Sequence, residues 1–147
     1  MNAHETIENH QSVLAAFGRW PSFHDGEVHR IVLDRSRHLA DDAFRPCIEL
    51  YIRGWVMIPD VTDTVHYKQE YDSVVHFLFE QVTELELDGF NHQNVLSSLD
   101  FAISMDDESK LPILSVELVH CYGLSGSFKA RRASVVSVVP YAHESTA

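Results

Sequence analysis

The sequence predicts an α+β protein that is mostly β, and three features of the chain carry this prediction. After Gly26, apolar residues recur at every second position through most of the chain, which is the period of a strand with one buried face. Short polar or Gly-containing segments separate these runs, as in hairpins. The βαβ spacing of a parallel sheet is missing. We expect an antiparallel meander of six to seven strands that forms an open or partly closed sheet.

The N-terminal segment predicts a helix that packs on this sheet. Its apolar residues share one helical face: Ile7, Leu14 and Phe17. Asn2 and Glu5 have the spacing of a capping box, in which each side chain bonds the other's backbone N–H. Gly18 suits the end of the helix, and Pro21 prevents its continuation.

The strands are predicted from period-two alternation and are bounded by turn residues. They cover residues 27–35, 47–57, 101–105, 112–121 and 127–139. Between residues 73 and 87 the alternation is long enough for one bent strand, or for two strands joined by a bulge. The period breaks near residues 91–99, where Asn91 as a cap predicts a short second helix.

Length and charge limit the class of protein. A chain of 147 residues predicts a single domain, residues 1–147. The net charge of −11 argues against nucleic acid and against anionic membranes, because both require Lys and Arg. With no apolar run long enough to span a membrane and no leader segment, we expect a cytoplasmic protein. An acidic surface either keeps the protein soluble or steers a basic partner.

The stretch WPSFHDGEV contains the most distinctive candidate residues. In the structural interpretation, Trp20 and Phe23 anchor the loop by burial and Pro21 fixes its path. Asp25 then accepts backbone N–H bonds in an Asx turn before the first strand. In the functional interpretation, His24 and Asp25 form the catalytic pair of a small hydrolase. We favour the structural interpretation because neighbouring polar groups usually satisfy one another.

The histidines and cysteines do not predict a metal site or a cofactor. The ten histidines are scattered, and neither HExxH nor CxxC occurs. His120 and Cys121 are adjacent on a predicted strand, so their side chains point to opposite faces. We predict no metal, no cofactor and no catalytic residue.

Carboxylates and tyrosines gather in the predicted loop before residue 73. Aromatic residues beside charged groups are typical of interface hot spots. The sequence therefore predicts partner binding through five residues of this loop: Asp63, Tyr67, Glu70, Tyr71 and Asp72. A second acidic run follows on the next strand, where like charges on one face repel and cost stability. It consists of Glu80, Glu84, Glu86 and Asp88.

Three segments, taken in order, are similar to a known family. WPSFHDGEV, ELDGFNHQNVL and HCYGLSGSFKARRASVVSVVP resemble the immunity protein 50 family of bacterial polymorphic-toxin systems, over roughly Phe17 to Pro140. The most specific piece holds Trp20, Pro21, Phe23, His24 and Asp25. The resemblance implies a small, mostly β, cytosolic protein that neutralises a cognate toxin by stoichiometric binding, without catalysis.

The charge adds one expectation to this resemblance. A toxin that acts on nucleic acid is commonly basic, so an acidic inhibitor could cover its active site. Three alternatives stay open. They are a small hydrolase that uses His24 and Asp25, a β domain that binds a small ligand, and a homodimer that forms through the exposed sheet edge.

Overall fold

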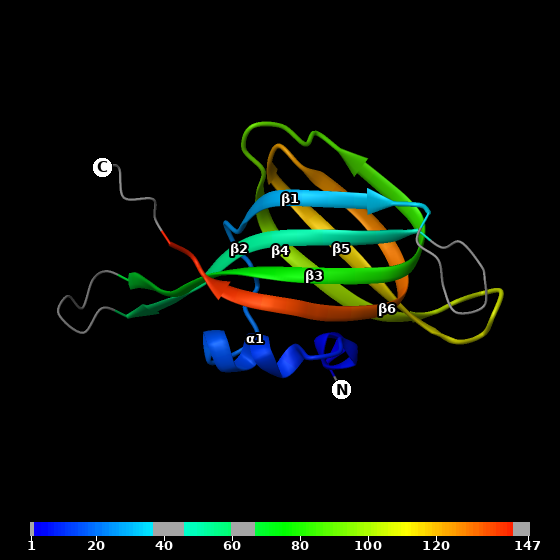
Figure 1. Cartoon of the computed structure of the whole chain (residues 1–147), viewed down its shortest axis with the longest axis horizontal. Helices are drawn as coiled ribbons and strands as arrows, with labels where there is room; N and C mark the ends of the chain where they lie inside the picture. The colour runs from blue at the N-terminus through cyan, green and yellow to red at the C-terminus, as the bar shows by residue number, and fades with distance from the viewer. Residues whose placement is uncertain (1, 37–45, 60–66, 143–147) are drawn as a thin grey trace.

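The computed structural model of the protein describes residues 2–36, 46–59 and 67–142. Six antiparallel strands form a closed barrel, with an N-terminal helix and a short 3-10 turn beside it (Figure 1). The elements are η1 (Ala3–Thr6), α1 (His10–Phe17), β1 (Glu27–Asp34), β2 (Cys47–Pro59), β3 (Tyr67–Asp88), β4 (Val95–Met105), β5 (Pro112–Tyr122) and β6 (Ser125–Pro140). The predicted α+β, mostly β class is confirmed.

The strand order differs from a simple meander. Around the barrel the order is β1-β2-β3-β6-β5-β4, so β4 follows β3 in the chain but lies away from it. Two three-stranded meanders therefore face each other, joined by the long β3–β6 ladder and by a short seam between β1 and β4. The segment between β3 and β4 is six residues long, 89–94, and it carries the chain to the β1 side instead of turning back on β3.

The predicted second helix near 91–99 is wrong, because the chain enters β4 at Val95. Two register irregularities explain the error. The pairing of β4 with β5 shifts between Val95 and Leu96 and again between Leu96 and Ser98. The extra residue places Leu96 and Leu99 together in the core although they are three apart in sequence. Three-residue spacing of apolar residues imitates a helix.

The N-terminal helix is shorter than predicted. Residues 3–6 form η1, and Glu8 then pairs with β6 through two backbone hydrogen bonds before α1 begins at His10. Asn2 makes no side-chain cap bond, so the predicted capping box does not form. The predicted C-terminus is correct, since the N–H of Gly18 bonds to Leu14 in a left-handed cap. α1 packs against β3 and β6.

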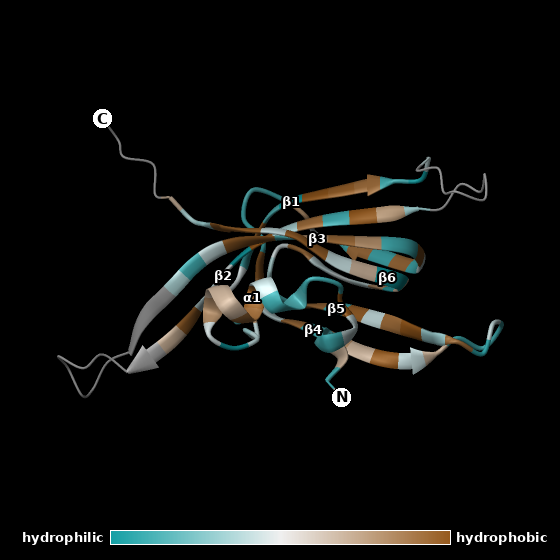
Figure 2. Cartoon of the chain, turned by 60° about the horizontal axis from the view of Figure 1, so that its bottom comes forward, coloured by the Kyte–Doolittle hydropathy of each residue, from teal (hydrophilic) through white to brown (hydrophobic). Residues whose placement is uncertain are grey.

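The inward positions of the strands make one apolar core. Phe77 and Phe79 of β3 are fully buried and lie opposite Leu50 and Ile48 of β2. Phe23, from the loop before β1, inserts between α1 and β3 and contacts Phe77 edge to face, at 6.1 Å between ring centroids. Figure 2 shows the alternation of apolar and polar residues along the strands that this arrangement requires.

β2 and β3 continue beyond the barrel body, so part of the predicted loop before residue 73 is strand. Their ladder runs from Cys47 opposite Glu80 to Pro59 opposite Tyr67. The register shifts at Tyr71, whose φ of 61° marks a bulge. Figure 1 shows this end of the ladder projecting from the barrel.

Candidate functional site

The segment that contains His24 and Asp25 closes the barrel. β1 and β4 share a single ladder pair, Glu27 with Val95. The rest of the seam consists of backbone bonds around it. The N–H of Asp25 donates to Leu96 at 2.9 Å, and the N–H of Leu96 donates to Gly26 at 2.9 Å. These bonds join the two meanders, so this motif has a clear structural role.

Local backbone geometry explains the residues of this segment. Phe23 and Asp25 both have positive φ, 59° and 60°, and the N–H of Gly26 closes the turn by donating to Phe23 at 2.8 Å. The Phe23 ring is 1% exposed. It covers Gly54 of β2, where a Cβ would lie only 2.6 Å from the ring. Burial of Phe23, as predicted, therefore holds the turn against the sheet.

The His24 ring is oriented by the seam. Its Nδ1 lies 3.0 Å from the carbonyl oxygen of Ser97, and because a carbonyl can only accept, Nδ1 carries the proton. Nε2 lies 3.6 Å from Asp25, and both side chains are mostly exposed, at 71% and 57%. The Ser22 hydroxyl accepts the backbone N–H of His24, at 3.2 Å. Ser22, His24 and Asp25 thus do not form the relay of a nucleophilic triad.

The predicted Asx turn is wrong. Among the residues that the structure describes, the Asp25 carboxylate contacts His24 Nε2 and accepts no backbone N–H. The turn is closed instead by the backbone bond between Gly26 and Phe23. An Asx turn is not needed here, because Asp25 itself adopts the left-handed conformation and donates its N–H across the seam.

The three segments that resemble a family meet at this seam. The amide of Asn94, which is 3% exposed, bonds both backbone groups of Asn91. The N–H of Val28 donates to the carbonyl of Asn94 at 2.8 Å. Gly123 packs so close that a Cβ would lie 2.3 Å from Gln93 O. The segments that carry the family resemblance therefore contain the residues that close the barrel.

Four of the five predicted partner-binding residues lie on β3. Asp63 lies outside the described residues, while Tyr67 and Glu70 lie on β3 opposite Pro59 and Val56. Tyr71 is 53% exposed at the bulge.

Asp72 is engaged within the molecule. Its carboxylate accepts two hydrogen bonds from the Arg53 guanidinium, at 2.9 and 2.7 Å. The guanidinium also lies 3.8 Å from the centre of the Tyr141 ring. The hydrogen bond to Asp72 raises the pKa of Arg53. A charge already paired in this way offers less attraction to a basic partner.

A different set of carboxylates forms a row on the outer face of the barrel. Asp100 of β4 lies directly opposite Glu117 of β5, Glu117 lies opposite Ser127 of β6, and Ser127 lies opposite Glu86 of β3. We call Asp100, Glu117 and Glu86 the acidic row. All three are exposed, and none of their carboxylates has a hydrogen-bond or ion-pair partner among the described residues. Unpaired like charges in direct register repel.

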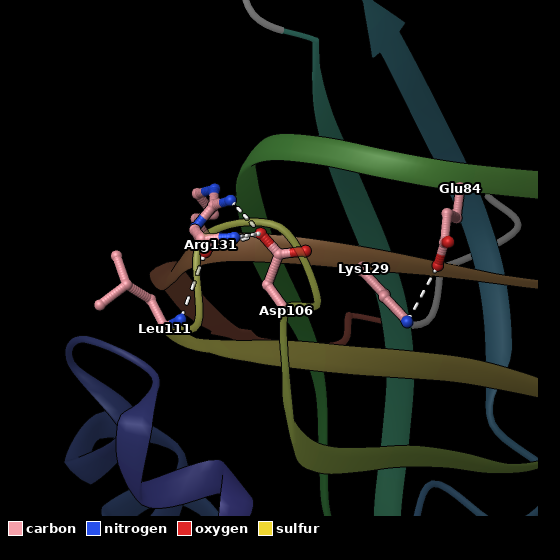
Figure 3. A network of polar contacts seen from close by, with 6 residues as sticks. Glu84, Asp106, Leu111, Lys129 and Arg131 are labelled. Carbon is pink, nitrogen blue, oxygen red and sulfur yellow. Dashed lines mark hydrogen bonds and ion pairs between the residues drawn. The ribbon is translucent and has the colours of Figure 1, made fainter.

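Asp100 and Glu117 of the acidic row line a groove of about 240 Å³ between β4, β5 and β6. Small side chains, Ala102 and Ser115, leave this space open. At its other edge the Lys129 ammonium lies 3.0 Å from Glu84, and this carboxylate raises the pKa of Lys129 (Figure 3). The groove therefore keeps an excess of negative charge after its one internal ion pair.

Sequence reasoning missed Asp100 and Glu117, although a signal was present. The polar segment 106–110, between the predicted strands 101–105 and 112–121, lies midway between them, so a regular hairpin would place them opposite each other. Glu86 was recognised as part of an acidic strand. Its place in the row depends on the β3–β6 pairing, which no local turn specifies.

The described residues contain no cluster of three metal-ligating side chains. Within those same ranges, every helix is too short or too polar to cross a membrane.

Fold and groove together define a class of protein: a small acidic β-barrel that presents a charged outer face. A family model described as Immunity protein 50 matches residues 9–141. The chain therefore belongs to the immunity protein 50 family, as the resemblance implied, and the family name indicates an immunity role against a toxin. No curated protein and no solved structure matches the chain.

Proposed function

We propose that this protein is a stoichiometric inhibitor that binds a basic toxin in the cytoplasm and blocks it without catalysis. The observation that carries the proposal is the acidic row on a barrel of the immunity protein 50 family. Asp100 and Glu117 lie opposite each other and no cation of the described residues pairs with them, which costs stability in the free protein. A basic partner would remove that repulsion on binding.

The groove geometry supports blocking by surface complementarity. A rigid barrel needs little ordering to bind, so less of the interaction energy is lost on association. Carboxylates along the groove would pair with the Lys and Arg side chains that a nucleic-acid-directed toxin uses on phosphates. The net charge of −11 would accelerate encounter with such a toxin.

The test begins with copurification from the native host, followed by quantitative binding. The tagged chain is isolated, its partner is identified by mass spectrometry, and the purified toxin domain is titrated with the wild-type protein. We expect a one-to-one complex and loss of toxin activity at equivalence. A wild-type protein that leaves the purified toxin domain active and unbound would refute the proposal.

A charge-reversal pair tests the surface. Asp100→Lys with Glu117→Lys should slow association with the toxin at low salt, because two row charges are reversed. The matched control, Asp107→Lys with Glu108→Lys, makes the same change of net charge on the exposed β4–β5 loop. Equal rates for both variants would mean that the acidic row is not the contact surface.

A further inference from the structure

The groove beside the acidic row, called the acidic groove below, is the first of three depressions, and each depression shares lining residues with the next. A middle depression of about 620 Å³ lies beside η1 and shares Asp100, Phe101 and Glu117 with the acidic groove. A third depression of about 480 Å³ lies against β2 and shares Trp20, Pro21 and Ser22 with the middle one. We call the three together the long groove. It runs from the acidic row, past Trp20, to β2.

The far end of the long groove is cationic. Arg19 and His24 line it beside the Trp55 ring. The exposed Arg19 guanidinium makes one long hydrogen bond, 3.4 Å to the carbonyl of Met57, and no carboxylate within the described residues pairs with it. The Asp25 carboxylate lies 3.6 Å from Nε2 of His24. An arginine without a carboxylate partner is unexpected in a chain of net charge −11, which has carboxylates in excess.

The middle of the long groove is aromatic and rigid. The half-buried Trp20 ring stacks on His4 at 4.5 Å and meets Phe101 edge to face at 5.9 Å. Pro21 is buried beside it. Because its neighbours already hold the Trp20 side chain in place, it loses little conformational entropy when a partner binds over it. This favours binding of an extended chain along the groove.

We infer that the long groove binds an extended segment of the toxin that carries basic side chains at one end and a carboxylate at the other. The basic side chains lie at the acidic row, and the carboxylate lies at Arg19. The inference rests on the proposed function and adds the recognised element and its direction. A segment bound in the opposite direction would place like charges together at both ends, which is the repulsion that gives specificity.

Reversing the polarity of the long groove tests this inference. The variant Arg19→Glu with Asp100→Lys exchanges one charge at each end and keeps the net charge, so long-range steering stays nearly constant. The control variant, Arg35→Glu with Asp107→Lys, makes the same exchange at two exposed residues outside the long groove. Both variants are titrated calorimetrically with the toxin domain identified above.

We expect the dissociation constant of the groove-reversed variant to rise at least about tenfold, and that of the control to stay within about twofold. Thermal unfolding of both variants checks that they fold. If the wild-type protein binds the toxin and the groove-reversed variant binds equally well, the inference is wrong and the proposed function stands. If the two variants weaken binding equally, the affinity depends on the general distribution of charge and not on the long groove, and the inference is wrong.

Two other outcomes also overturn the inference. A wild-type protein that does not bind the toxin removes the proposed function and this inference together. A wild-type protein that dimerises on its own, with the groove-reversed variant monomeric in sedimentation, would show that a second copy of the chain occupies the long groove.

Discussion

Gly54 shows how a single residue positions the family motif. The Phe23 ring lies where a Gly54 side chain would be, with a Cβ only 2.6 Å from the ring. The ring cannot move easily, because it is buried and its backbone is held at positive φ by the turn. Burial of Phe23 can be predicted from the sequence. The residue that its ring covers depends on the register of β2, and this register cannot be predicted from the sequence.

We predict that Gly54→Ala destabilises the protein by about 1–3 kcal/mol through overpacking, although alanine is otherwise the better strand residue. The measurement is the free energy of unfolding in urea. Phe23→Leu in the same chain removes the ring atoms that clash, so the second substitution should cost less in the Gly54→Ala background than alone. Additive losses would mean that the two residues do not interact.

Asp25 and Asp72 show the limit of residue-level reasoning about function. The sequence singles out Asp25 as a turn residue or the partner of His24, and Asp72 as a partner-binding carboxylate beside Tyr71. Their roles depend on where the backbone directs them. Asp25 contributes its N–H to the seam, and Asp72 pairs with Arg53 from the neighbouring strand. Residue type identified the segments, but pairing decided which carboxylates remain free.

At the scale of elements, η1 is joined to the motif by the stacked pair of His4 and Trp20. Burial lowers the pKa of His4 below its ordinary value of 6.5, although Glu5 acts in the opposite direction. The folded protein therefore holds a proton on His4 less readily than the unfolded chain does. The resulting stability is present above pH 6.5 and is lost as pH falls through the folded-state value.

We predict that His4→Phe, which keeps an aromatic ring on Trp20, flattens this part of the pH dependence. The urea midpoint is measured for both proteins at about pH 7.5 and about pH 5.5. The wild-type protein should lose more stability than the variant between these values. The other nine histidines are common to both proteins, so an identical loss would show that His4 does not contribute.

Elements with regular alternation could be predicted, and the irregular one could not. β2 and β5 were placed from period two alone, because their inward residues alternate over residues 48–56 and 114–118. β4 begins with two register irregularities, so its apolar residues have helical spacing. The competing explanation, a capped helix, used the same residues and was equally consistent with local propensity.

For the whole molecule, the sequence indicates the hairpins but not how the two meanders meet. Short turns specify β4–β5 and β5–β6, since the strands they join become neighbours. The β3–β6 ladder joins strands far apart in the chain, and the β1–β4 seam is made largely by a loop. The β4–β5 turn places Asp100 opposite Glu117, whereas the long-range β3–β6 pairing adds Glu86 to the acidic row. Only part of the candidate site could therefore be derived locally.

The charge of the whole molecule leads to a trade-off between stability and binding. Glu117 repels Asp100 directly across the β4–β5 ladder, so Glu117→Gln should stabilise the free protein by roughly 0.2–1 kcal/mol. The same substitution removes a carboxylate from the acidic row and should slow association with the toxin, more strongly at low salt. Urea unfolding and stopped-flow association measure the two effects.

Asp107→Asn is the matched control, because it removes one charge from the exposed loop of the same hairpin and does not lie in the acidic row. If both substitutions stabilise the protein equally, the gain comes from the net charge of −11 and not from the row. If Glu117→Gln stabilises the protein and leaves the association rate unchanged, the acidic row lowers stability without contributing to toxin binding, and the toxin binds elsewhere. A gain in stability together with slower binding, seen for Glu117→Gln alone, would identify the repulsion as a feature retained for recognition.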